Sequence, residues 1–126
     1  MIGRLQSYGV EVHVETDGVD FVDQANTIIK SPGVPKEAPA IVAAQAEGKT
    51  VIGELELGWR LLPNRFIAVT GTNGKTTTTE LLGEIFKAAN MPAATAGNVG
   101  TPVCELIGTI DPSAVVIAET SSFQLE

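Results

Sequence analysis

The sequence predicts an α/β protein that consists of two successive units with parallel strands. Strand and helix patterns alternate along the 126 residues, and this alternation is typical of parallel sheets covered by helices. Residues 114–118 are apolar at every position, as expected for a central parallel strand that is covered on both faces. Residues 71–74 form a glycine-rich turn between an apolar strand and an amphipathic helix.

The first unit combines three strand patterns with one helix pattern. The strands are predicted at residues 9–15, 27–30 and 50–52, and the helix at residues 39–47. Residues 9–15 alternate apolar and polar side chains, which predicts one solvent-exposed sheet face. We interpret the lone His13 on that face as solvated and not as a ligand. The strand at 27–30 stops at Ser31-Pro32-Gly33-Val34-Pro35, because two prolines around a glycine form a stiff turn.

The second unit follows a short helix, predicted at residues 54–62. Its strands are predicted at residues 66–70, 92–96 and 114–118, and its helices after the glycine-rich turn and at residues 101–110. The helix after the turn has an apolar stripe at helical spacing, formed by Leu81, Leu82, Ile85, Phe86 and Ala89. This order of elements indicates a parallel sheet.

Composition argues against several classes of partner. The formal net charge is −7, which disfavours non-specific binding to nucleic acids or anionic membranes, since both need a surplus of Lys and Arg. No apolar run approaches the roughly 20 residues of a membrane span, and no signal-peptide pattern occurs, so we expect a soluble cytoplasmic protein. The single Cys104 can form no internal disulfide, and we interpret it as a small buried hydrophobic residue.

A phosphate-binding loop is predicted at Gly71-Thr72-Asn73-Gly74-Lys75-Thr76. It joins a buried strand to a helix, a setting in which backbone N–H groups point at an anion. Lys75 falls in the first helical turn, where the helix dipole disfavours a cation by ~0.3–1 kcal/mol, and a bound polyphosphate removes this conflict. The general pattern G-x-x-x-x-G-K-[ST] requires glycine where this chain has Val69, so the loop fits the narrower variant G-T-x-G-K-[ST]. The alternative is an ordinary turn with an exposed lysine.

Polar residues follow the last predicted strand. Glu119 stands at its carboxyl end, where a carboxylate is costly unless it is paired or bound to a metal. The hydroxyl of Thr76 directly follows the loop lysine and, together with Glu119, offers the oxygen ligands that Mg²⁺ prefers. The alternative for Glu119 is a structural salt bridge. Asn98, Ser121 and Gln124 lie in predicted loops at the same sheet edge, where they either bind a polar substrate or have purely structural roles.

Four motifs occur in order along the chain and together resemble the Mur ligases. They are Ser31-Pro32-Gly33-Val34-Pro35, Gly71-Thr72-Asn73-Gly74-Lys75-Thr76-Thr77, Gly97-Asn98-Val99-Gly100 and Glu119-Thr120-Ser121-Ser122-Phe123-Gln124-Leu125-Glu126. The GTNGKT loop is shared with all Mur ligases and with folylpolyglutamate synthases. The SPGVP turn and the SSFQLE ending resemble the D-glutamate-adding branch of the family.

This resemblance implies a fragment of an ATP-dependent ligase with an α/β fold. Part of a Rossmann-like UDP-binding domain would occupy residues 1–57, and part of a P-loop-type parallel-sheet ATP-binding domain residues 58–126. The resemblance implies that ATP phosphorylates the alanyl carboxylate of UDP-N-acetylmuramoyl-L-alanine. D-glutamate then attacks the acyl phosphate, in the synthesis of a peptidoglycan precursor.

The resemblance also assigns roles to individual residues. Lys75 and Glu119 would be catalytic, and Thr76 and Glu119 would hold Mg²⁺. The ATP phosphates would be held by Gly71, Thr72, Asn73, Gly74, Lys75, Thr76 and Thr77. The UDP-muramoyl substrate would be lined by Ser31, Gly33, Asn98, Ser121 and Gln124.

Two other functions stay open. One is that of a related ligase, either another Mur enzyme or a folylpolyglutamate synthase, and the other is a nucleotide-binding module without catalysis. We expect the chain by itself to lack ligase activity. We also expect poor solubility, because the strand at 114–118 has no following helix to cover it and lacks a neighbouring strand.

Overall fold

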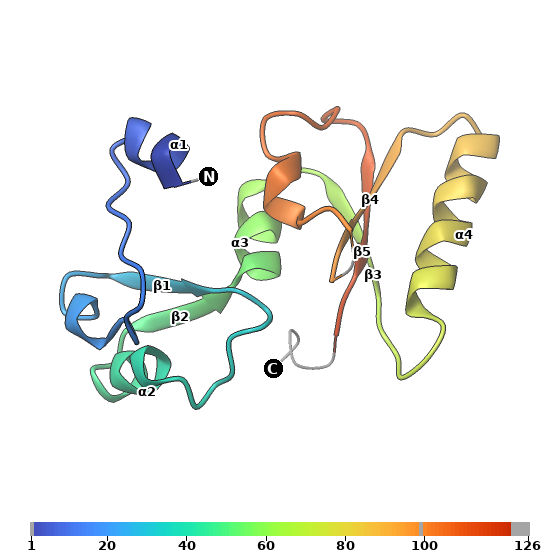
Figure 1. The fold of residues 1–126 in the computed structure, drawn as a ribbon. Coiled ribbons are helices and arrows are strands. Elements are labelled where there is room, and N and C mark those ends of the chain that lie inside the picture. The colour runs from blue at the N-terminus through green and yellow to red at the C-terminus, as the bar shows by residue number, and fades with distance from the viewer. Residues whose placement is uncertain (1, 99, 122–126) are drawn as a thin grey trace. The chain divides into compact units, whose positions relative to one another are not determined.

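The computed structural model of the chain describes residues 2–98 and 100–121 (Figure 1). They form two compact units, Met1–Ile28 with Lys36–Thr50 and Ile29–Pro35 with Val51–Glu126. The SPGVP turn thus belongs to the second unit, although it precedes most of that unit in sequence. The functional division of the chain between residues 57 and 58 stays a prediction.

The chain up to Gly53 contains short helices and two strands in its described part. These elements are α1 (Ile2–Ser7), the 3-10 helix η1 (Val19–Phe21), β1 (Thr27–Lys30), α2 (Pro39–Ala46) and β2 (Thr50–Gly53). β1 and β2 pair in a two-stranded sheet. Pro39 is the first residue of α2, a position where the missing N–H of proline removes no helical hydrogen bond. The strands predicted at 27–30 and 50–52 and the helix predicted at 39–47 are therefore confirmed.

The strand predicted at residues 9–15 is wrong. This segment has no regular secondary structure, and two of its three valines are exposed. An alternating pattern yields a strand only where a neighbouring strand exchanges hydrogen bonds with it, and no described strand pairs with this segment. The ring of His13 stacks on Phe21 with centroids 3.8 Å apart, and its Nε2 lies 2.9 Å from Glu11 Oε1. These exposed contacts account for His13 without a ligand.

A three-stranded parallel sheet organises the second unit. Its strands are β3 (Arg65–Val69), β4 (Ala93–Gly97) and β5 (Val115–Glu119), in the order β3-β5-β4. β5 is central and buried at every position, as its apolar run predicts. Both neighbouring strands precede β5 in sequence and pair with its two edges. The prediction that this strand lacks a neighbour is therefore wrong.

Helices cover both faces of this sheet (Figure 1). α4 (Lys75–Ala88) packs on one face, and α3 (Glu54–Leu61) lies with the 3-10 helix η2 (Val103–Leu106) on the other. The buried core on the α3 side consists of Leu62, Ala96, Val103, Val116 and Ala118. Since successive side chains of a strand point to opposite faces, Val116 and Ala118 of β5 face this core and Glu119 faces α4.

The helix predicted at residues 101–110 is wrong in length. Only Val103–Leu106 is helical, as a 3-10 turn that begins after Pro102. Gly108 has a φ of 76°, in the left-handed region, and so ends any continuation of the helix.

The apolar stripe predicted on α4 is only partly covered. Leu82 and Phe86 are half-buried, whereas Leu81 and Ile85 are 59% and 53% exposed. The buried Thr79 lies on the side of the helix that meets the sheet. The face of α4 that contacts the sheet is therefore rotated away from the centre of the apolar stripe, and Leu81 and Ile85 remain in solvent.

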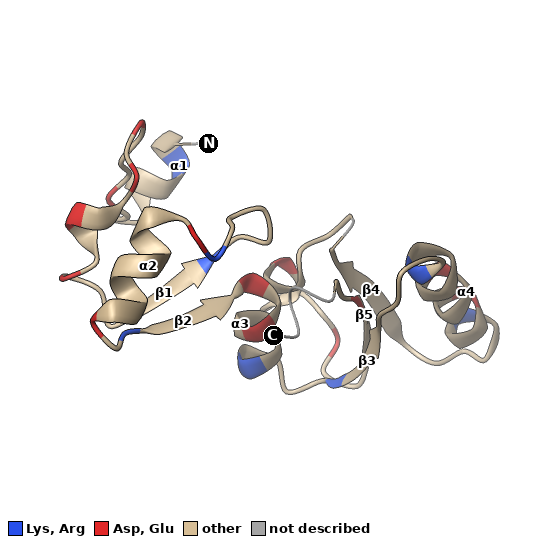
Figure 2. Ribbon diagram, turned by 90° about the horizontal axis from the view of Figure 1, so that it is seen from below, with Lys and Arg blue, Asp and Glu red and all other residues tan. Residues whose placement is uncertain are grey.

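Basic residues are spread along the chain and are fewer than acidic ones. Figure 2 shows Lys and Arg scattered over the elements, and the 8 Lys and Arg residues are outnumbered by 15 Asp and Glu. Within residues 2–98 and 100–121, no helix is both long enough and apolar enough to cross a bilayer.

Candidate nucleotide and metal site at the carboxyl ends of the sheet

The phosphate loop leaves the sheet at the end of β3 and enters α4. Gly74 is the N-cap of this helix and has a φ of 76°, a left-handed conformation that glycine adopts without strain. The backbone N–H of Thr78 donates to the carbonyl oxygen of Gly74 at 2.9 Å and so makes the first helical hydrogen bond. The exposed loop thus lies at the helix N-terminus, where backbone N–H groups and the helix dipole favour an anion.

Lys75 is the first residue of α4 and folds back over the loop. Its Nζ donates to the carbonyl oxygen of Gly71 at 2.8 Å, in an exposed position. No carboxylate pairs with Lys75 among the described residues. The ammonium group therefore lies against the loop, and a phosphate can replace a carbonyl as its partner at little cost.

Glu119 is a buried carboxylate with one hydroxyl partner. It is 4% exposed, and its Oε2 accepts a hydrogen bond of 2.8 Å from Thr76 Oγ1. No Lys, Arg or His of the described chain is within ion-pair distance of it, so the alternative of a structural salt bridge has no cation there. A buried carboxylate compensated by a single hydroxyl is energetically costly.

The donor set fits a hard divalent cation such as Mg²⁺. Thr76 and Glu119 present neighbouring oxygen atoms at the end of the phosphate loop. Among the residues that the structure describes, no three or more His, Cys, Asp or Glu side chains are grouped so that they could hold a metal ion by themselves. Mg²⁺ is usually held by one or two protein ligands together with water and substrate phosphates, which matches this sparse set.

Backbone hydrogen bonds fix Glu119 between the two outer strands. The register aligns Val69, Glu119 and Gly97 at the carboxyl ends of the sheet. The N–H of Thr120 donates to Val69 O at 2.9 Å, and the N–H of Asn98 donates to Glu119 O at 2.8 Å. These bonds hold Asn98 against the backbone of Glu119 on one side and the start of the phosphate loop on the other.

Gly97 permits this close approach. Its φ is 123°, and a Cβ at this position would lie 2.8 Å from the backbone N of Glu119 and 3.0 Å from its carbonyl carbon. Sequence reasoning missed the roles of Gly97 and Thr120 as the supports of Glu119. The signal that was available is the glycine at the end of a predicted strand, which often marks a close backbone approach.

The remaining predicted substrate residues fall in three places. Ser121 is half-buried and follows Thr120 at the end of β5, and Gln124 lies outside the described residues. Ser31 and Gly33 belong to a turn closed by a hydrogen bond of 3.0 Å from Val34 N to Ser31 O. Lys30 Nζ also donates to Val34 O at 3.3 Å. No hydrogen bond between described residues joins this turn to Glu119 or to the phosphate loop.

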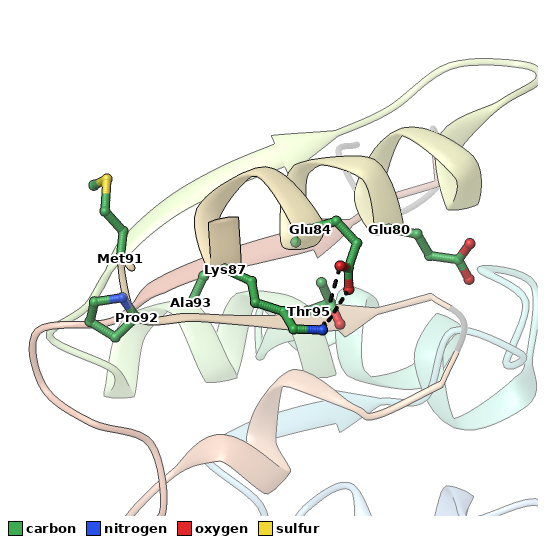
Figure 3. A pocket seen from close by; sticks show the side chains of 8 residues that line it. Glu80, Glu84, Lys87, Met91, Pro92, Ala93 and Thr95 are labelled. Carbon is green, nitrogen blue, oxygen red and sulfur yellow. Dashed lines mark hydrogen bonds and ion pairs between the residues drawn. The ribbon is translucent and has the colours of Figure 1, made fainter. Parts of the chain in front are cut away.

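A separate hollow of about 650 Å³ lies between α4 and the edge strand β4 (Figure 3). It is lined by Glu80, Gly83, Glu84, Lys87, Met91, Pro92, Ala93 and Thr95. Lys87 Nζ is 3.3 Å from Glu84 Oε1, so its charge is already paired. None of the lining residues is a predicted site residue, and the phosphate loop therefore remains the better candidate site.

Comparison with known proteins relates the chain to the Mur ligases. Residues 69–125 match the Mur ligase middle domain. The chain is 45% identical over 126 residues to the UDP-N-acetylmuramoylalanine–D-glutamate ligase of Gloeothece citriformis, an alignment that covers 98% of this chain and 28% of that protein. The ligase of the same name from Microcystis aeruginosa is 48% identical, with the same two coverages. The chain thus spans about a quarter of the length of these relatives.

A solved structure supports the fold. The UDP-N-acetylmuramate:L-alanyl-gamma-D-glutamyl-meso-diaminopimelate ligase from Neisseria meningitides superposes with a TM-score of 0.53 and 21% identity, over 92% of this chain and 40% of that one. At this identity the likeness concerns the fold alone, and it agrees with the α/β class predicted from the sequence. Together with the matched middle domain and the relatives of 45–48% identity, it leads to one assignment. The chain belongs to the Mur ligase family.

Proposed function

We propose that this chain is part of an ATP-dependent ligase that adds D-glutamate to UDP-N-acetylmuramoyl-L-alanine in peptidoglycan precursor synthesis. The names of its relatives support the choice of substrates, since they are called UDP-N-acetylmuramoylalanine–D-glutamate ligases. We further propose that the enzyme acts in the cytoplasm and needs neither nucleic acid nor a membrane. Residues 1–57 would belong to the UDP-substrate domain and residues 58–126 to the ATP domain.

In this proposal the loop at 71–77 holds the ATP phosphates. The backbone N–H groups at the start of α4 face the phosphate oxygens, and Lys75 exchanges its contact with Gly71 O for one with a phosphate. Thr76 and Glu119 are the protein ligands of Mg²⁺. When bound, this ion neutralises charge on the outer phosphate oxygens.

The chemistry proceeds by way of an acyl phosphate. The alanyl carboxylate attacks the γ-phosphorus, and ADP leaves. The amine of D-glutamate then attacks the acyl carbon, and phosphate leaves from the tetrahedral intermediate. The residues of this chain contribute alignment and a preorganised positive charge at the transferring group.

The muramoyl substrate would be bound by Ser31, Gly33, Asn98, Ser121 and Gln124. Gly33 supports this assignment, because nothing lies within 4 Å of a Cβ built on it and its φ is outside the left-handed region. Neither packing nor backbone conformation therefore requires glycine there. A ligand that approaches the backbone closely would explain the absence of a side chain.

The observation that carries the proposal is the buried Glu119 with Thr76 as its hydrogen-bond partner beside the phosphate loop. The test uses the full-length protein, meaning the complete product of the reading frame that encodes these residues. Phosphate release is measured with ATP, Mg²⁺ and UDP-N-acetylmuramoyl-L-alanine, with and without D-glutamate. We expect release that needs all four components.

Other outcomes identify the alternatives. Release with another amino acid in place of D-glutamate would indicate a different Mur ligase. Release with a folate and L-glutamate would indicate a folylpolyglutamate synthase. ATP binding without any release would indicate a non-catalytic nucleotide-binding module.

A further inference from the structure

Helix α3 and the 3-10 helix η2 are joined by two hydrogen bonds that the proposed chemistry does not use. Glu54 Oε1 accepts a hydrogen bond of 2.6 Å from the backbone N–H of Cys104. In the second bond, Cys104 Sγ donates to the backbone carbonyl oxygen of Glu54 at 3.4 Å. The ionised acceptor makes the first bond the stronger one, and it lies at the N-terminal end of η2, where a negative charge is favourable.

Close packing fixes the position of η2 along α3. Gly58 of α3 is buried against Val103, and a Cβ on Gly58 would lie 2.9 Å from Val103 Cβ. Val103 is fully buried in the core on this side of the sheet. Because this buried contact prevents η2 from sliding along α3, Glu54 and Cys104 are held at a fixed position relative to each other.

The segment between β4 and η2 carries the proposed substrate residue Asn98. At its start, Asn98 N donates to Glu119 O at 2.8 Å, and Gly97 N donates to Thr101 O at 2.9 Å. At its end, Cys104 N is held by Glu54. The segment is therefore anchored at the backbone of Glu119, whose side chain is the proposed metal ligand, and at Glu54 of α3.

We propose that Glu54 is a positioning residue that holds η2, and through it Asn98, in the geometry required for the muramoyl substrate. This inference rests on the proposed function, because it takes Asn98 as a substrate contact. Glu54 itself touches no substrate in this scheme. Its role is to prevent the end of the segment from moving away from Glu119.

The thiol of Cys104 reports on this contact. Cys104 is only partly buried, so its interpretation as a buried hydrophobic residue is wrong. This partial burial, together with hydrogen bonding to the Glu54 side chain and its negative charge, raises the pKa of Cys104 from its ordinary 9.0 to about 11. The thiolate is the reactive form, so alkylation at pH 8 is slow while Glu54 is in place. Loss of the carboxylate lowers the pKa of Cys104 and accelerates alkylation.

The experiment compares Glu54→Ala, Glu54→Gln and the control Glu56→Ala in the full-length protein. Glu56 lies on the same helix and pairs with Arg60, so its removal leaves Cys104 untouched. We expect Glu54→Ala to raise KM for the muramoyl substrate about tenfold, equivalent to ~1.4 kcal/mol, while KM for ATP stays unchanged. Glu54→Gln retains an acceptor oxygen and should keep KM near the wild-type value, but it should accelerate alkylation of Cys104, measured by peptide mass spectrometry.

Several results would overturn the inference. If Glu54→Ala leaves the KM values for the muramoyl substrate and for ATP unchanged, Glu54 has no positioning role. If it raises both KM values and lowers the melting temperature, the role of Glu54 is only structural. If the wild-type protein has no ligase activity, the proposed function fails first. Hydrogen exchange at the N–H of Asn98 then decides the positioning role: faster exchange in Glu54→Ala than in Glu56→Ala supports it, and equal rates refute it.

Discussion

Gly97→Ala tests whether the backbone at the end of β4 sets the position of Glu119. The φ of Gly97 is 123°, and an added Cβ would lie 2.8 Å from Glu119 N and 3.0 Å from its carbonyl carbon. The strained backbone costs ~1–3 kcal/mol, and the steric overlap costs a further ~1–3 kcal/mol. We therefore expect the free energy of unfolding to fall by ~2–6 kcal/mol.

The same substitution should impair the proposed metal site in molecules that remain folded. Relief of the overlap moves the backbone of Glu119, whose carboxylate is 2.8 Å from Thr76 Oγ1. A displacement of about 1 Å in a positioned group can reduce the rate by ~10²-fold. Turnover should fall by about this factor, and half-maximal activity should need more Mg²⁺.

The assay combines urea unfolding with Mg²⁺ activation of the full-length protein. Gly3→Ala is the matched control, because Gly3 has an ordinary φ, lies in α1 and has nothing within 4 Å of an added Cβ. It should change neither measurement by much. A Gly97→Ala protein with an unchanged unfolding midpoint and an unchanged Mg²⁺ curve would refute the reasoning.

Four further outcomes are expected. Lys75→Ala should lower turnover at saturating ATP by at least ~10²-fold with the fold intact, since it removes a preorganised cation; near-normal turnover would contradict this. Glu119→Gln should shift Mg²⁺ activation to higher concentrations because the charge is lost, and an unchanged curve would argue for a structural role. Gly33→Ala should leave the melting temperature unchanged but raise KM for the muramoyl substrate, whereas an unaffected KM would exclude close ligand approach there. Residues 1–126 alone should show no ligase turnover, because they span only about a quarter of the length of the relatives and catalysis needs many groups aligned around one site; sustained turnover that depends on both the muramoyl substrate and D-glutamate would disprove the fragment interpretation.

Poor solubility of the isolated chain stays a prediction, but the structure contradicts the reason that the sequence suggested for it. β5 is buried and paired on both edges, so it is not the exposed surface that the sequence suggested. Leu81 and Ile85 on α4 are instead more than half exposed. If the isolated chain associates, we expect these two apolar side chains, one helical turn apart, to lie in the contact.

The sequence by itself determined the elements whose signals are local. The apolar run at 114–118 identified the central strand, and the glycine-rich turn after β3 identified the start of α4, because side-chain periodicity and glycine placement act within a few residues. It also indicated Thr76 and Glu119 as neighbours, since the carboxyl ends of parallel strands share one edge of a sheet. The hydrogen bond of 2.8 Å between these two residues agrees with that expectation.

Only the tertiary structure decided which segments find partners. Residues 9–15 have a strand pattern but no neighbouring strand, and β5 has two neighbours where the sequence suggested a missing one. The contact of Glu54 with Cys104 joins residues that are 50 positions apart, and neither local sequence contains a pattern that predicts it. Hydrogen bonds between distant segments depend on how whole elements pack, and this packing is a property of the assembled sheet and helices rather than of any short stretch of chain.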